Sequence, residues 1–217
     1  MISPLLDIPL LVLVTNRNVV ADKSELIARI DVAAQHGVNI IQIRENDLPP
    51  EELYELCREV KTVVDGRALV MINDKVDIGA SAELDGAHLT EHSMSLENAR
   101  EIMGAGAVFS GSSHDVERAV QLCSAGIDFI IAGTMFETET HPGKIPEGLK
   151  LLEEIKDKID CPIVGIGGIT LNNLDDVINS GAIGVAVIRE ILTAKETDSV
   201  TKDLRSKLDE VLNSIND

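Results

Sequence analysis

The chain has 217 residues, of which 44% are hydrophobic, with one tyrosine, three phenylalanines and no tryptophan. That length suits one large domain, because α/β barrels of about 200–250 residues commonly form a single unit. The formal net charge of −18 argues against nucleic acid or an anionic membrane as a partner, since both bind basic surfaces.

The opening stretch, MISPLLDIPLLVLVT, has no basic start and too short an apolar run to span a membrane. We therefore expect neither a signal peptide nor a transmembrane helix, and a cytoplasmic location. Three cysteines, Cys57, Cys123 and Cys161, lack the spacing of metal ligands. Their odd number predicts reduced thiols, buried in helices and a strand.

Short apolar runs alternate with amphipathic stretches, such as PPEELYELCREVKTVV, along the whole chain. The runs are nearly continuous in Val, Ile and Leu, as in parallel strands buried on both faces. They cover Leu10–Thr15, Asn39–Arg44, Ala68–Asn73, Gly86–Thr90, Val108–Ser113, Phe129–Met135, Pro162–Gly168 and Gly184–Arg189. Four joints, in AAQHGVNIIQI, ELDGAHL, CSAGIDFII and NSGAIGVAVI, place a C-cap glycine between a helix and a strand. The pattern predicts an α/β fold: a single (β/α)8 TIM barrel, one domain over residues 1–217.

In such barrels the chemistry lies where the strands end. The second run ends in IIQIREND, where Gln42 and Arg44 are two residues apart and therefore point to the same side, into the barrel mouth. Arg44 is suited to bind phosphate or carboxylate oxygens. The alternative is a surface arginine paired with Glu45 or Asp47.

The third run ends in MINDKVD, with Asn73 and Asp74 directly after the apolar residues. Mg²⁺ in phosphate enzymes usually takes one or two carboxylates plus substrate oxygens, so this position predicts metal or substrate contact. The same residues would also suit the cap of the following helix. In the fourth run, His88 is either a core residue or a substrate contact, and His92 beyond it is expected to be a loop residue.

The fifth run ends in SGSSHD, where we expect the Ser112 hydroxyl to donate to a phosphate; a helix cap is the alternative. His114 follows, but no third group completes a nucleophilic triad. The sixth run leads into MFETETHPGKIPEG, which predicts a lid over a phosphorylated substrate, with exposed loop filler as the alternative. Its candidate donors are Thr138, Thr140, His141 and Lys144.

The seventh run, in IVGIGGITLNN, ends in Gly167 and Gly168. Loops after the seventh and eighth strands of such barrels commonly bind phosphate through backbone N–H groups, and glycine lets the backbone approach closely. The alternative is a tight turn that needs positive φ. Because the acidic chain repels phosphate at long range, such a site must be locally positive.

The motifs IND, DGAHL, FETET and PIVGIGGIT, in this order, resemble the thiamin phosphate synthase and thiazole tautomerase family over nearly the whole chain. The resemblance implies a barrel that joins hydroxymethylpyrimidine diphosphate to thiazole phosphate and releases diphosphate, with Mg²⁺ and basic groups stabilising the leaving group. It implies that Gln42 and His88 face the pyrimidine, that Arg44, Asn73 and Ser112 bind diphosphate, and that Asp74 ligates Mg²⁺. Thr138, Thr140, Gly167, Gly168 and Ile188 would hold the thiazole phosphate.

The chain departs from the family pattern at several of these positions. The synthases resembled here have lysine at the position of Asn46, aspartate at that of Ser93, lysine at that of His141 and serine at that of Arg189. Lys75, Lys144 and Arg189 lie close in sequence to the positions that differ from the family pattern, and they could supply the missing positive charge. A protonated His141 could also donate a hydrogen bond in place of lysine. We therefore count Arg189 among the substrate-binding candidates and His141, with Arg44, Asp74 and Ser112, among the catalytic ones.

Two other activities fit the same resemblance. A tautomerase would carry a histidine after Gly133, where this chain has Thr134, so His141 or His88 would need to replace it. A non-catalytic thiamin-phosphate binder is the third reading. The leading expectation is a synthase that uses Mg²⁺ and small phosphorylated substrates, with a homodimer as the candidate assembly.

Overall fold

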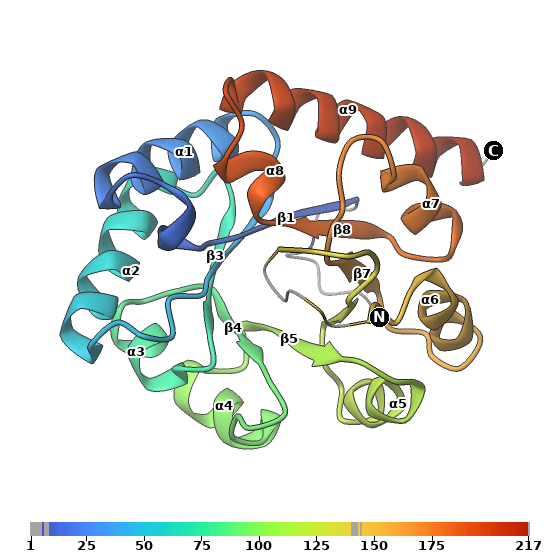
Figure 1. Ribbon diagram of the computed structural model, residues 1–217. Coiled ribbons are helices and arrows are strands. Elements are labelled where there is room, and N and C mark those ends of the chain that lie inside the picture. The colour runs from blue at the N-terminus through green and yellow to red at the C-terminus, as the bar shows by residue number, and fades with distance from the viewer. Residues whose placement is uncertain (1–5, 7–8, 140–142, 144, 217) are drawn as a thin grey trace.

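A closed barrel of eight parallel strands, ordered β1 to β8, forms the centre of the molecule (Figure 1). The computed structural model describes residues 6, 9–139, 143 and 145–216. The strands are β1 Leu10–Val14, β2 Ile40–Ile43, β3 Leu69–Asn73, β4 Gly86–Leu89, β5 Val108–Ser113, β6 Phe129–Gly133, β7 Ile163–Ile166 and β8 Gly184–Val187. β1 pairs with both β2 and β8, which closes the ring. The predicted TIM barrel is confirmed.

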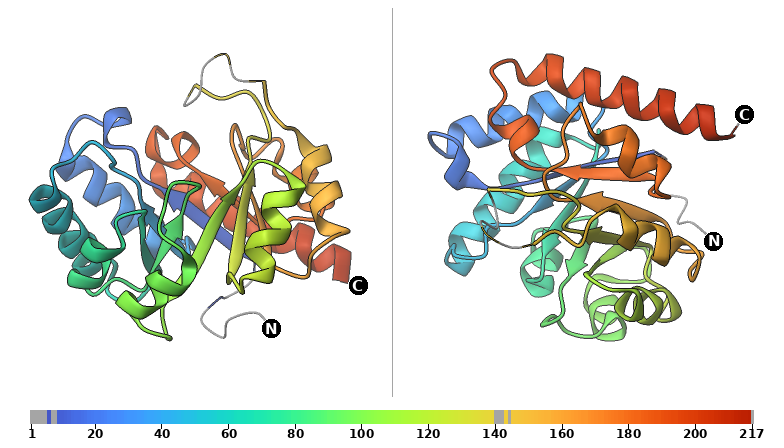
Figure 2. Two further views of the ribbon diagram at one scale, coloured as in Figure 1. Left: turned by 90° about the horizontal axis from the view of Figure 1, so that it is seen from below. Right: turned by 45° about the vertical axis from the view of Figure 1, so that its right-hand side comes forward.

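Helices surround the barrel on its outside (Figure 2). They are α1 Lys23–Gln35, α2 Pro50–Val64, α3 Val76–Ser81, α4 Leu96–Met103, α5 Val116–Ser124, α6 Leu149–Lys156, α7 Leu174–Asn179, α8 Arg189–Leu192 and α9 Thr197–Asn216, with a 3₁₀ turn, η1, at Arg17–Val19. Local chemistry sets their ends: the Asp22 side chain accepts from the Glu25 N–H at the start of α1, at 2.9 Å. Within the described residues, no helix has the length and apolar character that crossing a membrane requires.

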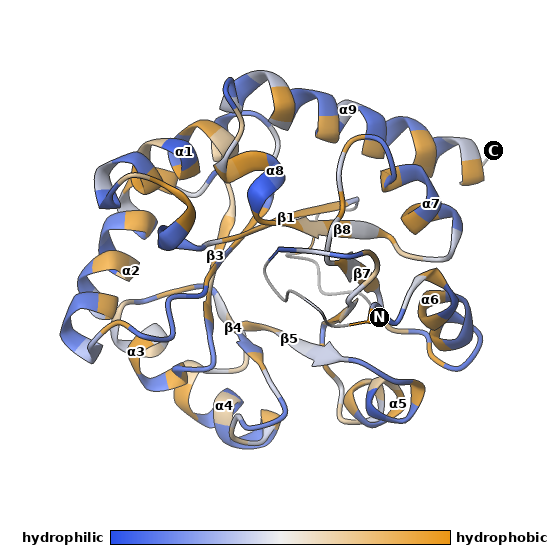
Figure 3. Cartoon of the chain, in the orientation of Figure 1, coloured by the Kyte–Doolittle hydropathy of each residue, from blue (hydrophilic) through white to orange (hydrophobic). Residues whose placement is uncertain are grey.

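The strands are buried on both faces, which explains why their sequences do not alternate between apolar and polar residues. The residues facing the helices form the larger apolar cluster, and the helices turn their own apolar sides towards it (Figure 3). A second cluster fills the barrel and includes Leu10, Val12, Met71, Phe129 and Val164. On β2 to β5, by contrast, inward positions near the carboxyl ends are polar.

Three of those inward positions lie side by side. Asn73 on β3 is the register partner of His88 on β4, which in turn is the partner of Ser110 on β5. All three side chains are buried, as is Gln42 on β2. The strand period of two therefore assembles one layer of polar side chains above the apolar barrel core.

Glycine has a different role at one of the four predicted helix–strand joints. Gly37, Gly126 and Gly181 have positive φ, as expected, but Gly86 does not. Gly86 is the first residue of β4, and a Cβ there would lie 1.8 Å from the Val108 carbonyl oxygen. The C-cap prediction is wrong for Gly86: close strand packing requires this glycine, and Glu83 takes the left-handed conformation in that joint.

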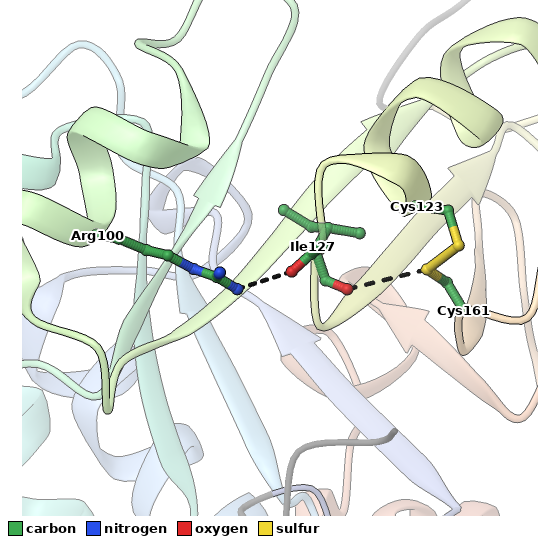
Figure 4. Close-up of a disulfide and its surroundings, with 5 residues drawn as sticks. Arg100, Cys123, Ile127 and Cys161 are labelled. Atoms are coloured by element: carbon green, nitrogen blue, oxygen red, sulfur yellow. Dashed lines mark hydrogen bonds between the residues drawn. A yellow bond between two sulfur atoms is a disulfide. The ribbon is translucent and has the colours of Figure 1, made fainter.

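The prediction of three reduced, buried cysteines is wrong for Cys123 and Cys161 and confirmed for Cys57. Cys123, in α5, forms a disulfide with Cys161, which precedes β7, and their Cα atoms are 5.8 Å apart (Figure 4). Both are half-buried. Among the described residues Cys57 is the free thiol, and burial raises its pKa to about 12. The pairing escaped the sequence because it depends on how a helix end and a distant strand start meet.

Candidate active site

A cavity of about 500 Å³ opens at the carboxyl ends of the strands. Most of the sequence-predicted site residues line it: Gln42, Arg44, Asn73, His88, Ser112, Thr138, Gly167, Gly168, Ile188 and Arg189. Thr140, His141 and Lys144 lie outside the described residues. Asp74 is beside the lining residue Asn73 but is not itself part of the lining. Lys75 is exposed at the N-cap of α3, and it too is not among the residues that line the cavity.

An amide chain forms one part of the cavity wall. The Gln42 side chain donates from Nε2 to Asn73 Oδ1 at 3.0 Å, and Asn73 Nδ2 donates to Asn46 Oδ1 at 3.1 Å. Asn46 is exposed and lines the cavity at the position where the resemblance places a lysine. The wall therefore offers neutral donors and acceptors there, in place of a cation.

His88 is held between two serine hydroxyls. Its Nδ1 lies 2.8 Å from Ser110 Oγ and its Nε2 lies 2.6 Å from Ser112 Oγ. Burial is the main cause that lowers the pKa of His88 to about 4; the nearby Arg44 charge acts in the same direction and Asp74 opposes it. The imidazole is therefore neutral near pH 7, with one nitrogen donating and the other accepting.

Arg44 does not pair with the carboxylates that follow it. Arg17, from the loop after β1, donates to Glu45 Oε2 at 3.2 Å and to both Asp47 oxygens at 2.6 and 2.7 Å. Glu45 is buried, and it also accepts from the Arg17 backbone N–H. Because Arg17 occupies both carboxylates, the surface-pair alternative for Arg44 is wrong, and Arg44 lines the cavity without an ion pair to any described residue.

Asp74 stands at the end of β3 with a φ of 70°. Its Oδ1 accepts from Ser93 Oγ at 2.6 Å. The helix-cap alternative is wrong, because Lys75 is the N-cap residue of α3 and no side chain bonds the cap there. Ser93, where the resemblance places a second aspartate, lies in direct contact with Asp74.

The residues around Asp74 bear on the predicted Mg²⁺. In the described part of the chain, no three His, Cys, Asp or Glu side chains group as a metal site. Asp74 Oδ2 accepts no hydrogen bond from a described residue, so it is open to a cation. A single carboxylate fits Mg²⁺ when substrate phosphate oxygens and water complete the octahedron.

Gly167 and Gly168 follow β7 with φ values of 104° and 63°. A Cβ on Gly167 would lie 2.3 Å from Thr134 Cγ2, and one on Gly168 would lie 2.4 Å from the Glu137 carbonyl oxygen. Both glycines are therefore required by the tight turn itself, as the alternative interpretation held. The N–H groups of Gly168 and Ile169 donate to no acceptor among the described residues, so they remain free to bind an anion.

Side chains brace the loop that these glycines begin. Asn173 accepts from the Thr170 N–H at 2.8 Å and donates to the Gly168 carbonyl at 3.0 Å. Glu190, at the start of α8, accepts from the Leu171 N–H at 2.9 Å. These contacts fix the loop after β7 against the loop after β8.

Several residues of the site were not singled out as functional from the sequence. The Glu147 carboxylate accepts from the Thr134 N–H and lies 3.8 Å from His114 Nδ1, which also bonds the Gly133 carbonyl. Glu139 pairs with Arg189 at 3.1 Å, and it lines the cavity together with His92 and His114. No sequence signal indicates these contacts, since they join separate loops or distant positions of the long loop after β6. The helix-cap alternative for Ser112 is wrong, because Asp115 caps α5.

A closed barrel with a cavity of mixed apolar and polar residues at the carboxyl ends of its strands is typical of a (β/α)8-barrel enzyme for small ligands. A family model described as thiamine monophosphate synthase matches residues 11–191. The chain belongs to this family.

Individual relatives agree with the family model. The chain is 30% identical over 203 residues to thiamine-phosphate synthase 2 of Streptococcus pneumoniae, covering 93% of this chain and 96% of that protein. It is 36% identical over 184 residues to the thiamine-phosphate synthase of Clostridium botulinum, covering 84% and 89%. The structure of a thiamine phosphate pyrophosphorylase from Pyrococcus furiosus superposes with a TM-score of 0.82 at 28% identity, covering 94% and 96%.

Proposed function

We propose that this chain is a transferase of thiamin biosynthesis that joins hydroxymethylpyrimidine diphosphate to thiazole phosphate and releases diphosphate. The observation that carries the proposal is a single cavity whose two walls carry different functional groups, in a chain of this family. One wall, from β2 to β5, has neutral amides, a neutral imidazole and a guanidinium. The other, from β6 to β8, has the glycine loop.

The first wall suits the pyrimidine diphosphate. Gln42 and the neutral His88 would face the pyrimidine ring, while Arg44, Asn73 and Ser112 would bind diphosphate oxygens. A guanidinium forms charge-assisted bonds to such oxygens, each worth about 1.5–3 kcal/mol. Arg44 is available for this contact because Arg17 holds Glu45 and Asp47.

The second wall suits the thiazole phosphate. The free N–H groups of Gly168 and Ile169 support anion binding there. Gly167 shapes the turn, Thr138 and Ile188 line the space beside it, and Arg189 adds a positive charge. Thr140 and His141 complete the proposed set of ligands in the loop after β6.

Asp74 would ligate Mg²⁺ through Oδ2, with Ser93 fixing the orientation of its carboxylate. The cation, when bound, would neutralise charge on the departing diphosphate. Arg44, Asn73 and Ser112 would hold that group in line with the bond that breaks, so that the thiazole nitrogen can capture the pyrimidine carbon from the opposite wall.

The tautomerase alternative lacks support in this cavity. Its acid–base histidine would stand at Thr134, whose hydroxyl cannot shuttle protons near neutral pH. His88, one of the proposed substitutes, has a pKa of about 4 and has both ring nitrogens bonded to serines. The relatives described above are named as two synthases and a pyrophosphorylase, and neither they nor the cavity favours a non-catalytic binder.

Three further points belong to the proposal. Pairing of β1 with β8 joins the two halves of the chain, which supports one domain over residues 1–217. A homodimer is proposed on the general frequency of twofold oligomers, and light scattering would test it. Charged phosphates do not cross membranes, which supports a cytoplasmic location, although the disulfide is unusual for that compartment.

The first test is to incubate the purified chain with both substrates and Mg²⁺ and to follow diphosphate release. We expect Asp74→Asn to lower turnover by about 100-fold or more, because leaving-group stabilisation by a metal contributes several kcal/mol. Asp77→Asn is the matched control, since Asp77 is exposed on α3, away from the cavity, and it should retain wild-type turnover. Equal turnover in wild type, in Asp74→Asn and with chelator present would exclude the proposed role of Asp74 and Mg²⁺, and no diphosphate release by the wild type would exclude the proposed reaction.

A further inference from the structure

An ion pair spans the mouth of the cavity. Arg189, at the start of α8, pairs through Nη1 with Oε2 of Glu139, in the loop after β6, at 3.1 Å. Both residues line the cavity. The Glu139 side chain is 78% exposed and that of Arg189 is 42% exposed, so this pair is held only weakly against water.

The Arg189 guanidinium keeps hydrogen-bonding capacity that its pair with Glu139 does not use. Its Nε is buried and has no hydrogen-bond partner among the described residues. A buried donor on a charged group favours any acceptor that reaches it. The resemblance places serine at this position, so the guanidinium is a feature of this chain and not of the family pattern.

We infer that Arg189 is a side-chain ligand of the substrate phosphate and that Glu139 is its internal competitor, which occupies the guanidinium until a phosphate monoester displaces it. A phosphate dianion carries more charge than a carboxylate and offers three strong acceptors, so it displaces the Glu139 carboxylate from the guanidinium. The exchange makes the site selective for dianionic ligands, because a weaker anion does not displace Glu139. This inference rests on the proposed function for the class of ligand.

The test is a mutant cycle read by calorimetry, with the thiazole phosphate as probe and its dephosphorylated alcohol as the blank. We expect Arg189→Ser to weaken binding by about tenfold or more, as for loss of a charge-assisted bond. We expect Glu139→Gln to tighten binding about threefold, because a ligand then no longer has to break a weak surface ion pair. In the Arg189→Ser background, Glu139→Gln should have no effect.

Two more variants sharpen the cycle. Arg189→Lys keeps the charge but not the Nε donor, so its affinity should fall between those of wild type and Arg189→Ser. Glu154→Gln removes the carboxylate of an exposed pair with Lys150 on α6, and it should bind as wild type does.

Unchanged or weaker binding in Glu139→Gln would overturn the inference, as would an equal effect of that substitution with and without Arg189. Wild-type affinity in Arg189→Ser would overturn it too, yet diphosphate release would still support the proposed reaction. Conversely, a cycle with the expected signs but no turnover in wild type would keep the inference and remove the synthase assignment.

Discussion

At the scale of single residues, the acid–base state of His88 links the cavity to the stability of the barrel. The imidazole is buried between Ser110 and Ser112, and burial lowers its pKa from the usual 6.5 to about 4. In the unfolded chain the same ring binds a proton below about pH 6.5. The unfolded state therefore binds more protons than the native state between these two values, and stability falls as the pH is lowered through this window.

His88→Gln should reduce this pH dependence. We expect the free energy of unfolding of the wild type to drop by about 3 kcal/mol more than that of the variant between pH 6.5 and pH 4, since one pKa unit corresponds to about 1.36 kcal/mol. Urea unfolding at several pH values measures the difference, with circular dichroism at pH 7 to establish that the variant is folded. Parallel stability curves for the two chains would contradict the assignment of a neutral, buried His88.

The sequence predicted which residues face the cavity better than it predicted their partners. Gln42 could be placed from strand period and position, whereas for Asn73 and His88 structural alternatives stay open until the resemblance assigns them to the site. That Arg17 holds Glu45 and Asp47, 28 and 30 positions away, could not be read from the chain, because it depends on how two loops fold over each other. Glu139 lies inside the FETET motif, yet nothing in that motif indicates an arginine partner.

At the scale of elements, the loop after β7 depends on its backbone. Gly168 combines a φ of 63° with close approach to the Glu137 carbonyl, so its conformation also positions the loop after β6. The two loops border the same cavity. A change at this turn is therefore expected to affect both folding and phosphate binding.

Gly168→Ala should lower the free energy of unfolding by about 2 kcal/mol, from left-handed strain and the clash of the new Cβ. It should also weaken thiazole phosphate binding, because the N–H groups of Gly168 and Ile169 would shift. Gly106→Ala is the control, since a Cβ there meets nothing within 4 Å. Calorimetry and urea unfolding of both variants give the comparison, and equal behaviour would show that the turn tolerates a side chain.

Strands were the most predictable elements, and joints between elements the least. Continuous apolar runs marked all eight strands, although β6 ends at Gly133, before the Met135 expected. The Gly86 joint was misassigned because a close approach between strands is invisible in a local glycine pattern. Short-range sequence signals thus predict which element forms, while its end depends on neighbours in space.

At the scale of the whole molecule, the cavity and the disulfide lie at opposite ends of the barrel. Cys123 lies in the last turn of α5, which returns from β5, and Cys161 precedes β7. Their bond therefore lies on the side of the barrel where the strands begin. The cavity opens at the carboxyl ends of the strands. The barrel was predictable from the whole pattern of runs, whereas this cross-link was not, because the cysteines are 38 residues apart.

Replacing both cysteines by serine should lower the free energy of unfolding by about 2–4 kcal/mol, as expected for a loop of this length. Phosphate binding at the distant cavity should not change. Thermal unfolding with and without a thiol reductant is the measurement, and the reductant should lower the transition of the wild type but not of the double variant. Equal sensitivity of both chains to the reductant would show that the wild-type thiols are not paired.

Arg17 has a consequence for how this chain can vary. The Arg17 guanidinium bonds both Glu45 and Asp47, so a change at one of these three positions affects the other two. The neighbouring Arg44 takes no part in these bonds and stays available to the cavity. Among homologous chains, substitutions at 17, 45 and 47 should therefore occur together, whereas Arg44 should be retained independently of them. Correlated replacement across an alignment would reveal this dependence without any measurement on the purified enzyme.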